Sequence, residues 1–462
     1  MPDSSDIELT GRSALDLAAL VSSGLVTAEY VAKTTLAAIA ACDDQAIFTR
    51  VTADRAMAEA RAATLRLGNG CALSGLDGVP MAWKDLFDLE GIVTTAGSLV
   101  LAKNAPATAD AAVVAKLKAA GMVCIGHVNM TEFAFSGLGL NPHFGTPRNA
   151  CGRDVPRVPG GSSSGSAVAV ARGLVPVAIG TDTGGSVRVP AALNGIIGYK
   201  ASSQRYPMDG VFPLAPTLDT LGIFARNVRD VVMVDAAMCG LLAPVVRPAA
   251  LKELRVLVPT NVVLEGCDAA VIDNFEAALA HLAAAGALIK RQAMPIFDEI
   301  LEMTARLGSI ATAEVYALHQ QRVDGPQAGA IDRRVVARIK LGAAMPMVDY
   351  IALMQARARL VAQSAAEMTG HCVVAMPTVP HTAPPIAPLE ADDDLFVKVN
   401  LKTLRNTMLG NFLGWCGVSF PTGTDALGLP TALLLSGAPG TDEHLLALSL
   451  SVEALMQPGA NQ

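Results

Sequence analysis

The sequence predicts an α/β fold, in which a central sheet is covered by helices on both of its faces. Two observations favour this class. Between residues 221 and 285, short β-type runs (221–226 and 254–259) alternate with helix-like segments (228–238 and 269–285). Such alternation is typical of a sheet with helices packed on either side. Apolar residues make up 52% of the 462-residue chain and charged residues only 17%, so a large buried core is expected.

The first third of the chain is expected to be mainly helical, with two strands. Apolar residues at helical spacing predict helices, and short apolar runs predict strands. In chain order, the expected elements are helices at 14–20, 27–41 and 53–67, a strand that ends at Lys84, a helix at 108–120 and a strand at 122–127. Residues 129–159 then form a loop, and a loop of this length inside a compact domain is usually functional.

The pattern turns helical between Met294 and Glu367, with breaks near Gly325 and Pro346. A helical subdomain or insert is therefore possible at 295–370. The remaining expected elements are a strand at 372–378, a proline-rich acidic loop at 381–394, a helix at 402–416, a strand at 431–435 and a helix at 443–456. No internal repeat or clear linker interrupts the chain, so a single domain over residues 1–462 is expected.

Composition excludes several classes of protein. The net charge is −7 and no Lys/Arg-rich run is present, which argues against a nucleic-acid partner. The acidic start MPDSSDIELTG is unlike a secretory signal, and no apolar stretch is long enough to span a membrane. The eight cysteines form no C-x-x-C pair, and the seven histidines form no H-E-x-x-H motif. We therefore expect a soluble, cytoplasmic protein with reduced thiols and without a metal or other cofactor.

Residues 160–186 hold two glycine–serine clusters, GGSSSGS and TDTGGS, joined by a short apolar link. The link favours a short buried helix at 166–173, then a strand at 175–179 closed by Gly180. Flexible turns are the commonest role of such clusters. A phosphate-binding P-loop is excluded, because neither cluster ends in Gly-Lys-Ser/Thr. Residues 161–165 fit G-x-S-x-G, but Pro156 and Pro159 argue against the strand that a nucleophile elbow requires.

Three segments carry a resemblance to a known family: GVPMAWKD (78–85), the block at 159–200, and GLPTALLLSG (428–437). Together they resemble the amidase signature family of serine hydrolases, and weaker similarity runs from about residue 15 to residue 455. The resemblance implies one mixed-sheet α/β/α domain. By itself, a lysine such as Lys84 after an apolar run is usually a snorkelling surface residue. Beside two serine loops it could instead be a desolvated base.

The resemblance also implies roles for single residues. Ser186 is expected to be the nucleophile, Ser162 a relay serine preceded by a cis peptide bond, and Lys84 the base. Lys84 must then be neutral, and burial lowers a lysine pKa because it disfavours the ammonium. The run Thr183, Gly184, Gly185 and Ser186 is expected to form the oxyanion hole. Supporting roles are expected for Gly161, Ser163 and Asp182. Ser164 departs from the glycine of many relatives.

The implied activity is hydrolysis of a small aryl or apolar amide, anilide or carbamate through an acyl-enzyme on Ser186, with esterase side activity. The alternative is the glutaminase (A-type) subunit of a tRNA-dependent amidotransferase, although residues 205–222 lack the YGL…ASSLDQ pattern expected of that subunit. A catalytically dead binding protein is a third hypothesis, but all three triad positions are intact. We expect a small-molecule substrate and a monomer or homodimer.

The substrate pocket is expected to be built by the loop 129–159, the helices at 295–370 and the loop at 380–400, with Met130, Phe133, Phe135 and Phe144 in its lining. No arginine stands out as a carboxylate clamp.

Overall fold

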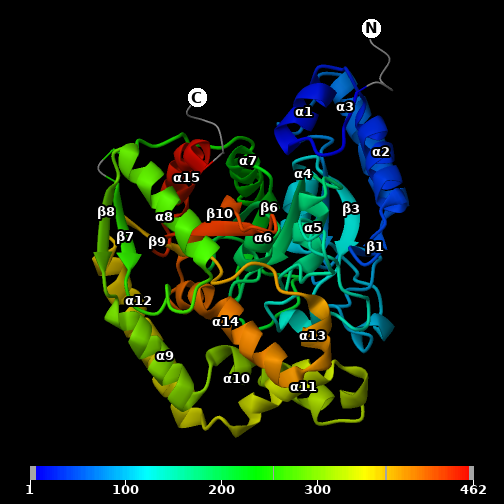
Figure 1. The fold of residues 1–462 in the computed structure, drawn as a ribbon. Helices are drawn as coiled ribbons and strands as arrows, with labels where there is room; N and C mark the ends of the chain where they lie inside the picture. The colour runs from blue at the N-terminus through cyan, green and yellow to red at the C-terminus, as the bar shows by residue number, and fades with distance from the viewer. Residues whose placement is uncertain (1–6, 253, 370–371, 457–462) are drawn as a thin grey trace.

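The computed structural model describes residues 7–252, 254–369 and 372–456 (Figure 1). Within these residues, eleven strands form one mixed sheet in the order β1-β3-β2-β4-β6-β5-β10-β11-β9-β7-β8. The bounds in chain order are β1 Phe48–Val51, β2 Pro80–Lys84, β3 Val123–Val128, β4 Val177–Thr181, β5 Ile197–Lys200, β6 Leu221–Ala225, β7 Arg255–Pro259, β8 Leu288–Gln292, β9 Cys372–Pro377, β10 Cys416–Thr424 and β11 Pro430–Gly437. The predicted α/β class, with a mixed central sheet between helices, is confirmed.

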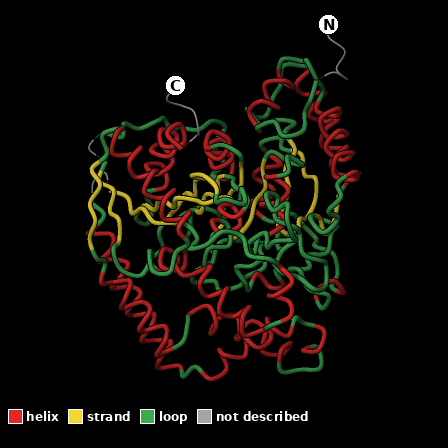
Figure 2. The backbone as a smooth tube through the Cα atoms, in the orientation of Figure 1, coloured by secondary structure: helices red, strands yellow, loops and turns green. Residues whose placement is uncertain are grey.

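Helices cover both faces of this sheet (Figures 1 and 2). In the view of Figure 1, α9 to α14 lie below the sheet, and α7 and α15 lie above it. The bounds are α1 Ala14–Ser22, α2 Ala28–Ala41, α3 Ala53–Gly68, α4 Ala112–Ala119, α5 Ser164–Ala171, α6 Arg188–Leu193, α7 Val228–Met238, α8 Ala269–Ala284, α9 Pro295–Leu307, α10 Ile310–Val323, α11 Arg333–Lys340, α12 Met347–Glu367, α13 Ile386–Ala391, α14 Asp393–Phe412 and α15 Asp442–Met456. In the described part of the chain, none of them is long and apolar enough to cross a membrane.

The middle of the sheet positions the two segments singled out in the sequence. Strand β2 pairs in parallel with β3 and with β4, and every residue of these three strands is buried. Continuous burial is expected for parallel strands that are covered on both faces. Because β2 and β4 run in the same direction, their carboxyl ends, at Lys84 and Thr181, meet at one edge of the sheet.

The structure corrects several predicted elements. Strands β1, β5, β8 and β10 were not predicted, and Gly180 lies inside β4 rather than closing it. The helix expected to reach Cys416 ends at Phe412, and Cys416 begins β10, which contains proline and glycine and therefore gives a weak strand pattern. The loop expected at 381–394 contains the short helix α13, whose proline-rich start is compatible with the first helical turn.

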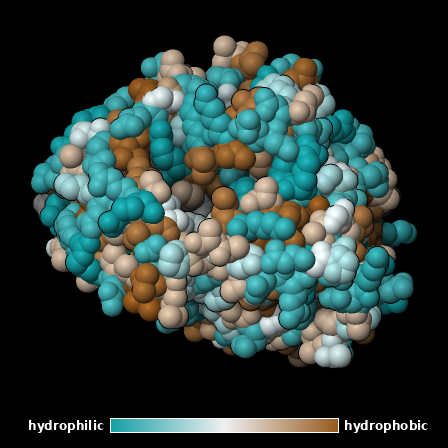
Figure 3. Space-filling model, turned by 90° about the horizontal axis from the view of Figure 1, so that it is seen from below, coloured by the Kyte–Doolittle hydropathy of each residue, from teal (hydrophilic) through white to brown (hydrophobic). Residues whose placement is uncertain are grey.

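The helices of residues 295–367 share the main hydrophobic core with the sheet. Ile296, Val315 and Leu353 belong to the same buried cluster as Trp83 of β2. Seen from the α9–α14 side, the surface is largely hydrophilic, with hydrophobic groups gathered around a hollow near its centre (Figure 3).

Candidate active site

The carboxyl ends of β2 and β4 bring Lys84 and Thr181 into contact, and Ser162 reaches the same lysine from the loop before α5. Lys84, the last residue of β2, is fully buried. Its Nζ atom lies 2.7 Å from Ser162 Oγ and 2.8 Å from Thr181 Oγ1. The interpretation of Lys84 as a snorkelling surface residue is therefore wrong. Thr181, which ends β4, was not predicted as a member of this group.

Burial lowers the pKa of Lys84 to about 7, because the ammonium is cut off from water. The negative charges of Asp219 and Asp182 act in the opposite direction and raise the pKa of this lysine. A lysine with a pKa near 7 is partly neutral at neutral pH. Such an amine can accept a proton from the hydroxyl that it touches.

Ser162 follows a cis peptide bond to Gly161, as the resemblance implies. The Ser162 carbonyl accepts a hydrogen bond from the Thr131 N–H at 3.0 Å, and the Gly161 N–H donates to the Gly137 carbonyl at 2.7 Å. A Cβ atom on Gly161 would lie 2.5 Å from the Gly139 nitrogen, closer than any side chain allows. Glycine is thus required here for close packing against the loop 129–159.

The loop that carries Ser186 is held by a buried carboxylate. Asp182 accepts hydrogen bonds from the backbone N–H groups of Gly185 at 2.9 Å and Val187 at 3.1 Å. It also forms an ion pair with the Arg188 guanidinium at 2.9 Å and accepts from the Asn411 amide at 2.8 Å. Burial raises the pKa of Asp182, but Arg188 more than offsets this and holds that pKa below its usual range. Asp182 therefore stays charged and fixes the loop.

These bonds decide which backbone groups of the loop can face a substrate. The Gly185 N–H, predicted as an oxyanion donor, donates instead to Asp182. Among the described residues, no acceptor is bonded to the N–H groups of Thr183, Gly184 and Ser186. These three remain the candidates for the oxyanion hole. Gly185 has φ +135°, a conformation that a side chain rarely adopts, and a Cβ atom there would clash with Thr407 Oγ1.

Ser163 ties the two serine loops together. Its backbone N–H donates to the Ser186 carbonyl at 3.4 Å, and its hydroxyl donates to the Thr181 carbonyl at 3.4 Å. The hydroxyl thus anchors the Ser162 loop to β4. Ser186 itself is 5% exposed, at the start of the turn into α6.

Asp219 is a site residue that sequence reasoning missed. Its Oδ1 atom accepts a hydrogen bond of 2.5 Å from Thr183 Oγ1, and its Oδ2 accepts from the N–H groups of Leu214 and Ala215. Burial raises the pKa of Asp219 above its usual value, although these hydrogen bonds and the charge of Lys84 act in the opposite direction. Asp219 lies in the segment 205–222, just before β6. No local motif marks it.

The predicted pocket residues differ in their surroundings. Met130 and Phe133 are fully buried, Phe135 is 5% exposed and Phe144 is half-buried. The Phe133 ring stacks on His319 of α10 with centroids 4.2 Å apart, and Phe135 lies under Arg338 of α11 at 4.2 Å. The loop 129–159 therefore meets the helices at 295–370. Whether these side chains contact substrate stays a prediction.

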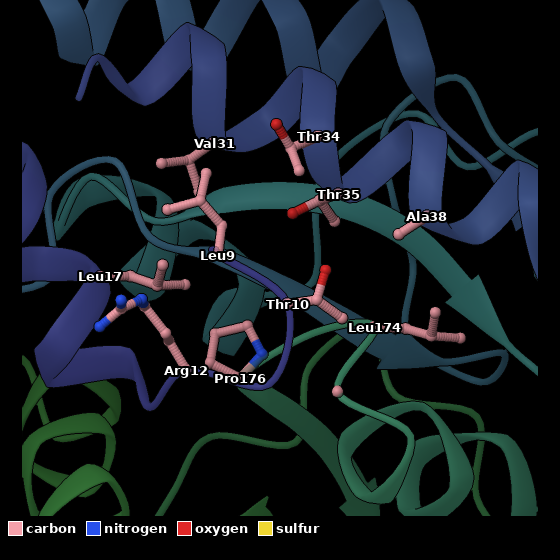
Figure 4. A pocket seen from close by; sticks show the side chains of 11 residues that line it. Leu9, Thr10, Arg12, Leu17, Val31, Thr34, Thr35, Ala38, Leu174 and Pro176 are labelled. Atoms are coloured by element: carbon pink, nitrogen blue, oxygen red, sulfur yellow. The ribbon is translucent and has the colours of Figure 1, made fainter. Parts of the chain in front are cut away.

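A small cavity lies away from the serine loops, and the titratable side chains form no metal site in the described residues. Between α2 and the start of the chain there is a cavity of only about 10 Å³, lined by residues such as Leu9, Val31 and Leu174 (Figure 4). Such a cavity has room for one water molecule and for no substrate. In the described ranges of the chain, no group of three or more His, Cys, Asp or Glu side chains is arranged to hold a metal ion.

Comparison with known proteins places this arrangement in a family. The sequence model of the amidase family matches residues 30–446. The 2-amino-5-chloromuconic acid deaminase of Comamonas testosteroni is 36% identical over 88% of this chain and 87% of its own length. Mandelamide hydrolase of Pseudomonas putida is 32% identical over 96% of this chain and 91% of its own. A glutamyl-tRNA(Gln) amidotransferase subunit of Acidothermus cellulolyticus, of the A type, is 34% identical over 97% and 95%.

The fold agrees with these matches. A crystal structure of an amidase superposes with a TM-score of 0.86 and 28% sequence identity, covering 96% of this chain and 100% of that one. Family match, relatives and fold all lead to the same assignment. The chain belongs to the amidase signature family and is a hydrolase that acts on carbon–nitrogen bonds other than peptide bonds.

Proposed function

We propose that this enzyme hydrolyses a small aryl or apolar amide, anilide or carbamate through an acyl-enzyme on Ser186. The observation that carries the proposal is the 2.7 Å contact between Ser162 Oγ and the fully buried Nζ of Lys84. A serine hydroxyl needs a base to become a nucleophile near neutral pH. A lysine with a pKa of about 7 supplies that base through the second serine.

In the proposed mechanism, neutral Lys84 accepts the Ser162 hydroxyl proton while Ser162 accepts that of Ser186. Ser186 Oγ then forms a bond to the substrate carbonyl carbon. The resulting oxyanion is bound by free backbone N–H groups of the loop 183–186, and one such donor contributes roughly 3–4 kcal/mol. The relay returns the proton to the leaving nitrogen as the C–N bond breaks. Water then attacks the acyl-enzyme through the same relay, which releases the acid and restores Ser186.

Two features support an aryl or apolar acyl group. The loop 129–159 places Phe133 and Phe135 against α10 and α11, and the Ser162 backbone is bonded to Thr131 of that loop at 3.0 Å. One relative is a mandelamide hydrolase, and mandelamide is an aromatic amide. Esters with the same acyl group should react as well, because they form the same acyl-enzyme.

The experiment is a turnover assay of the purified chain alone on benzamide, acetanilide and a phenyl carbamate, with Ser186→Ala as the blank. The proposal expects release of ammonia or amine without any partner or tRNA. The alternative, the glutaminase component of a tRNA-dependent amidotransferase, is favoured by the amidotransferase relative. It predicts weak glutaminase activity that a partner protein stimulates, and no turnover of the three test compounds. Size-exclusion chromatography of the active fraction checks the expected monomer or homodimer.

A further inference from the structure

A second cavity, of about 520 Å³, opens beside the catalytic centre. It is lined by residues 203–208, by Pro216, Thr217 and Asp219, and by Arg357 of α12. Asp219 lines the cavity and is bonded to Thr183 of the oxyanion loop at 2.5 Å. The cavity therefore adjoins the loop that carries Ser186.

The cavity wall and the loop 129–159 are bonded to different serine loops of the site. The loop 129–159 reaches the centre through Thr131, whose N–H is bonded to the Ser162 carbonyl. The cavity reaches it through Asp219, the carboxylate with the strongest effect on the charge of Lys84. The two halves of an amide leave the carbonyl carbon in different directions. If the loop 129–159 binds the acyl half, the cavity can bind the half attached to nitrogen. That half then lies near Lys84, which returns the proton.

The cavity wall holds one carboxylate, Asp219, and two guanidinium groups, those of Arg205 and Arg357. Arg205 is neutralised by Asp235 at 2.7 Å and by Glu443 at 2.8 Å. In the part of the chain that the structure describes, Arg357 forms no ion pair, and its Nε atom is shielded from solvent without a hydrogen-bond partner. Burial lowers the pKa of Arg357, and the negative charge of Glu314 acts in the opposite direction.

Glu314 is itself already engaged. Its two carboxylate oxygens accept hydrogen bonds from the Tyr350 hydroxyl at 2.7 Å and the Thr217 N–H at 3.0 Å. Arg357 thus keeps donors for an outside partner. Among cationic side chains, a guanidinium suits a carboxylate best, because its planar donors match the two carboxylate oxygens.

We propose that this cavity is the leaving-group side of the active site, and that Arg357 binds a carboxylate carried by the departing amine. The preferred substrates are then N-acyl amino acids, a class that rests on the proposed amidase function. Water is consumed, the acyl C–N bond breaks, the acyl group leaves as its acid, and the nitrogen takes the relay proton to leave as a free amino acid. No other reactant is needed.

The test compares N-benzoylglycine and N-benzoyl-β-alanine with N-ethylbenzamide, which has the same acyl group and no carboxylate. The readout is benzoate release by chromatography. For the wild type, kcat/KM should be higher for one of the acids than for N-ethylbenzamide. In Arg357→Met this ratio should fall about tenfold or more, mainly through KM, because a charge-assisted contact is lost. The control is Arg359→Met, on the same helix, whose partner Glu299 lies at the surface. It should keep the wild-type ratio.

A binding measurement keeps the two proposals apart. Calorimetric titration of N-benzoylglycine into Ser186→Ala protein requires no turnover. Binding that weakens about tenfold when Arg357→Met is added supports the cavity assignment, even if no amide is hydrolysed. Equal binding with and without Arg357, or acids that are no better than N-ethylbenzamide, would overturn it. Failure of benzamide turnover in the wild type would instead count against the proposed function.

Discussion

Lys84 Nζ and Ser162 Oγ lie 2.7 Å apart at a point where neither side chain has any exposed surface. A charged ammonium is costly at a buried position. Burial therefore favours the neutral amine of Lys84, which can accept a proton from Ser162. Strands β2 and β4 are parallel, so their carboxyl ends place Lys84 and the loop that carries Ser186 at one edge of the sheet. Ser162 reaches Lys84 from the loop before α5.

Replacement of Ser186 by alanine should abolish turnover, because the proposed acyl-enzyme forms on the Ser186 hydroxyl. Mass spectrometry with a slowly deacylating carbamate should show one adduct on the wild type and none on Ser186→Ala. The matched variant is Ser163→Ala, whose hydroxyl bonds the Thr181 carbonyl. It should still form the adduct. Normal activity in Ser186→Ala would place the nucleophile elsewhere.

Replacement of Ser162 by alanine should leave the nucleophile in place and interrupt proton transfer to Lys84. Loss of a positioned proton-transfer group typically costs about 10²–10⁴-fold in rate. We expect that loss in kcat, with a much smaller change in KM, in steady-state assays on one amide. A change confined to KM would show that Ser162 binds substrate and relays no proton.

Replacement of Asp219 by asparagine should lower the pH at which activity appears. The negative charge of Asp219 stabilises the Lys84 ammonium and so raises its pKa. Asparagine removes the charge but still offers Thr183 an acceptor oxygen, so the pKa of Lys84 should fall. The check is the midpoint of the kcat/KM–pH profile, with Asp154→Asn, a surface residue paired with Arg157, as control. An unmoved midpoint with a lower rate would mean that Asp219 is only structural.

The depressed pKa of Lys84 also predicts how stability depends on pH. Its folded pKa is about 7, against a usual value of 10.5. Between these values the unfolded chain binds more protons than the folded chain, so the contribution of Lys84 to stability rises with pH. Below pH 7 the full cost of burying the ammonium is present.

The measurement is urea unfolding of wild type and Lys84→Met from pH 6.5 to 10. The free energy of unfolding of the wild type should rise with pH relative to the variant. A constant or falling difference would contradict a depressed Lys84 pKa.

How much the sequence could predict depends on whether the signal is local. The serine block is contiguous, so Ser162, Ser163, Asp182 and Ser186 could be found from their spacing and family resemblance. The role of Lys84 as the base could be inferred only from the family resemblance, since a lysine after an apolar run is usually a surface residue.

Contacts between distant segments could not be predicted. Thr181 meets Lys84 across 97 residues, and Asp219 meets Thr183 across 36. Thr181 opens the TDTGGS cluster, but its contact with Lys84 depends on the parallel pairing of β2 and β4. Asp219 has no neighbouring motif and lies in the loop before β6. Strand β8 was missed for a related reason: its sequence LIKRQ is polar because it lies at the edge of the sheet. The sequence also could not show that Gly185 is not free to bind an oxyanion. Its N–H donates to the Asp182 carboxylate, which the fold of the loop brings within reach.

The most direct test of the account is the pH–rate profile of wild type, Lys84→Ala and Lys84→Arg on one amide, with folding checked by circular dichroism. The wild-type rate should rise with pH around a midpoint near 7, where Lys84 loses its proton. Arginine keeps the charge but cannot lose its proton at any accessible pH. Lys84→Arg should therefore be folded, as inactive as Lys84→Ala, and not rescued at high pH. A folded arginine variant with substantial activity would contradict the lysine-base mechanism.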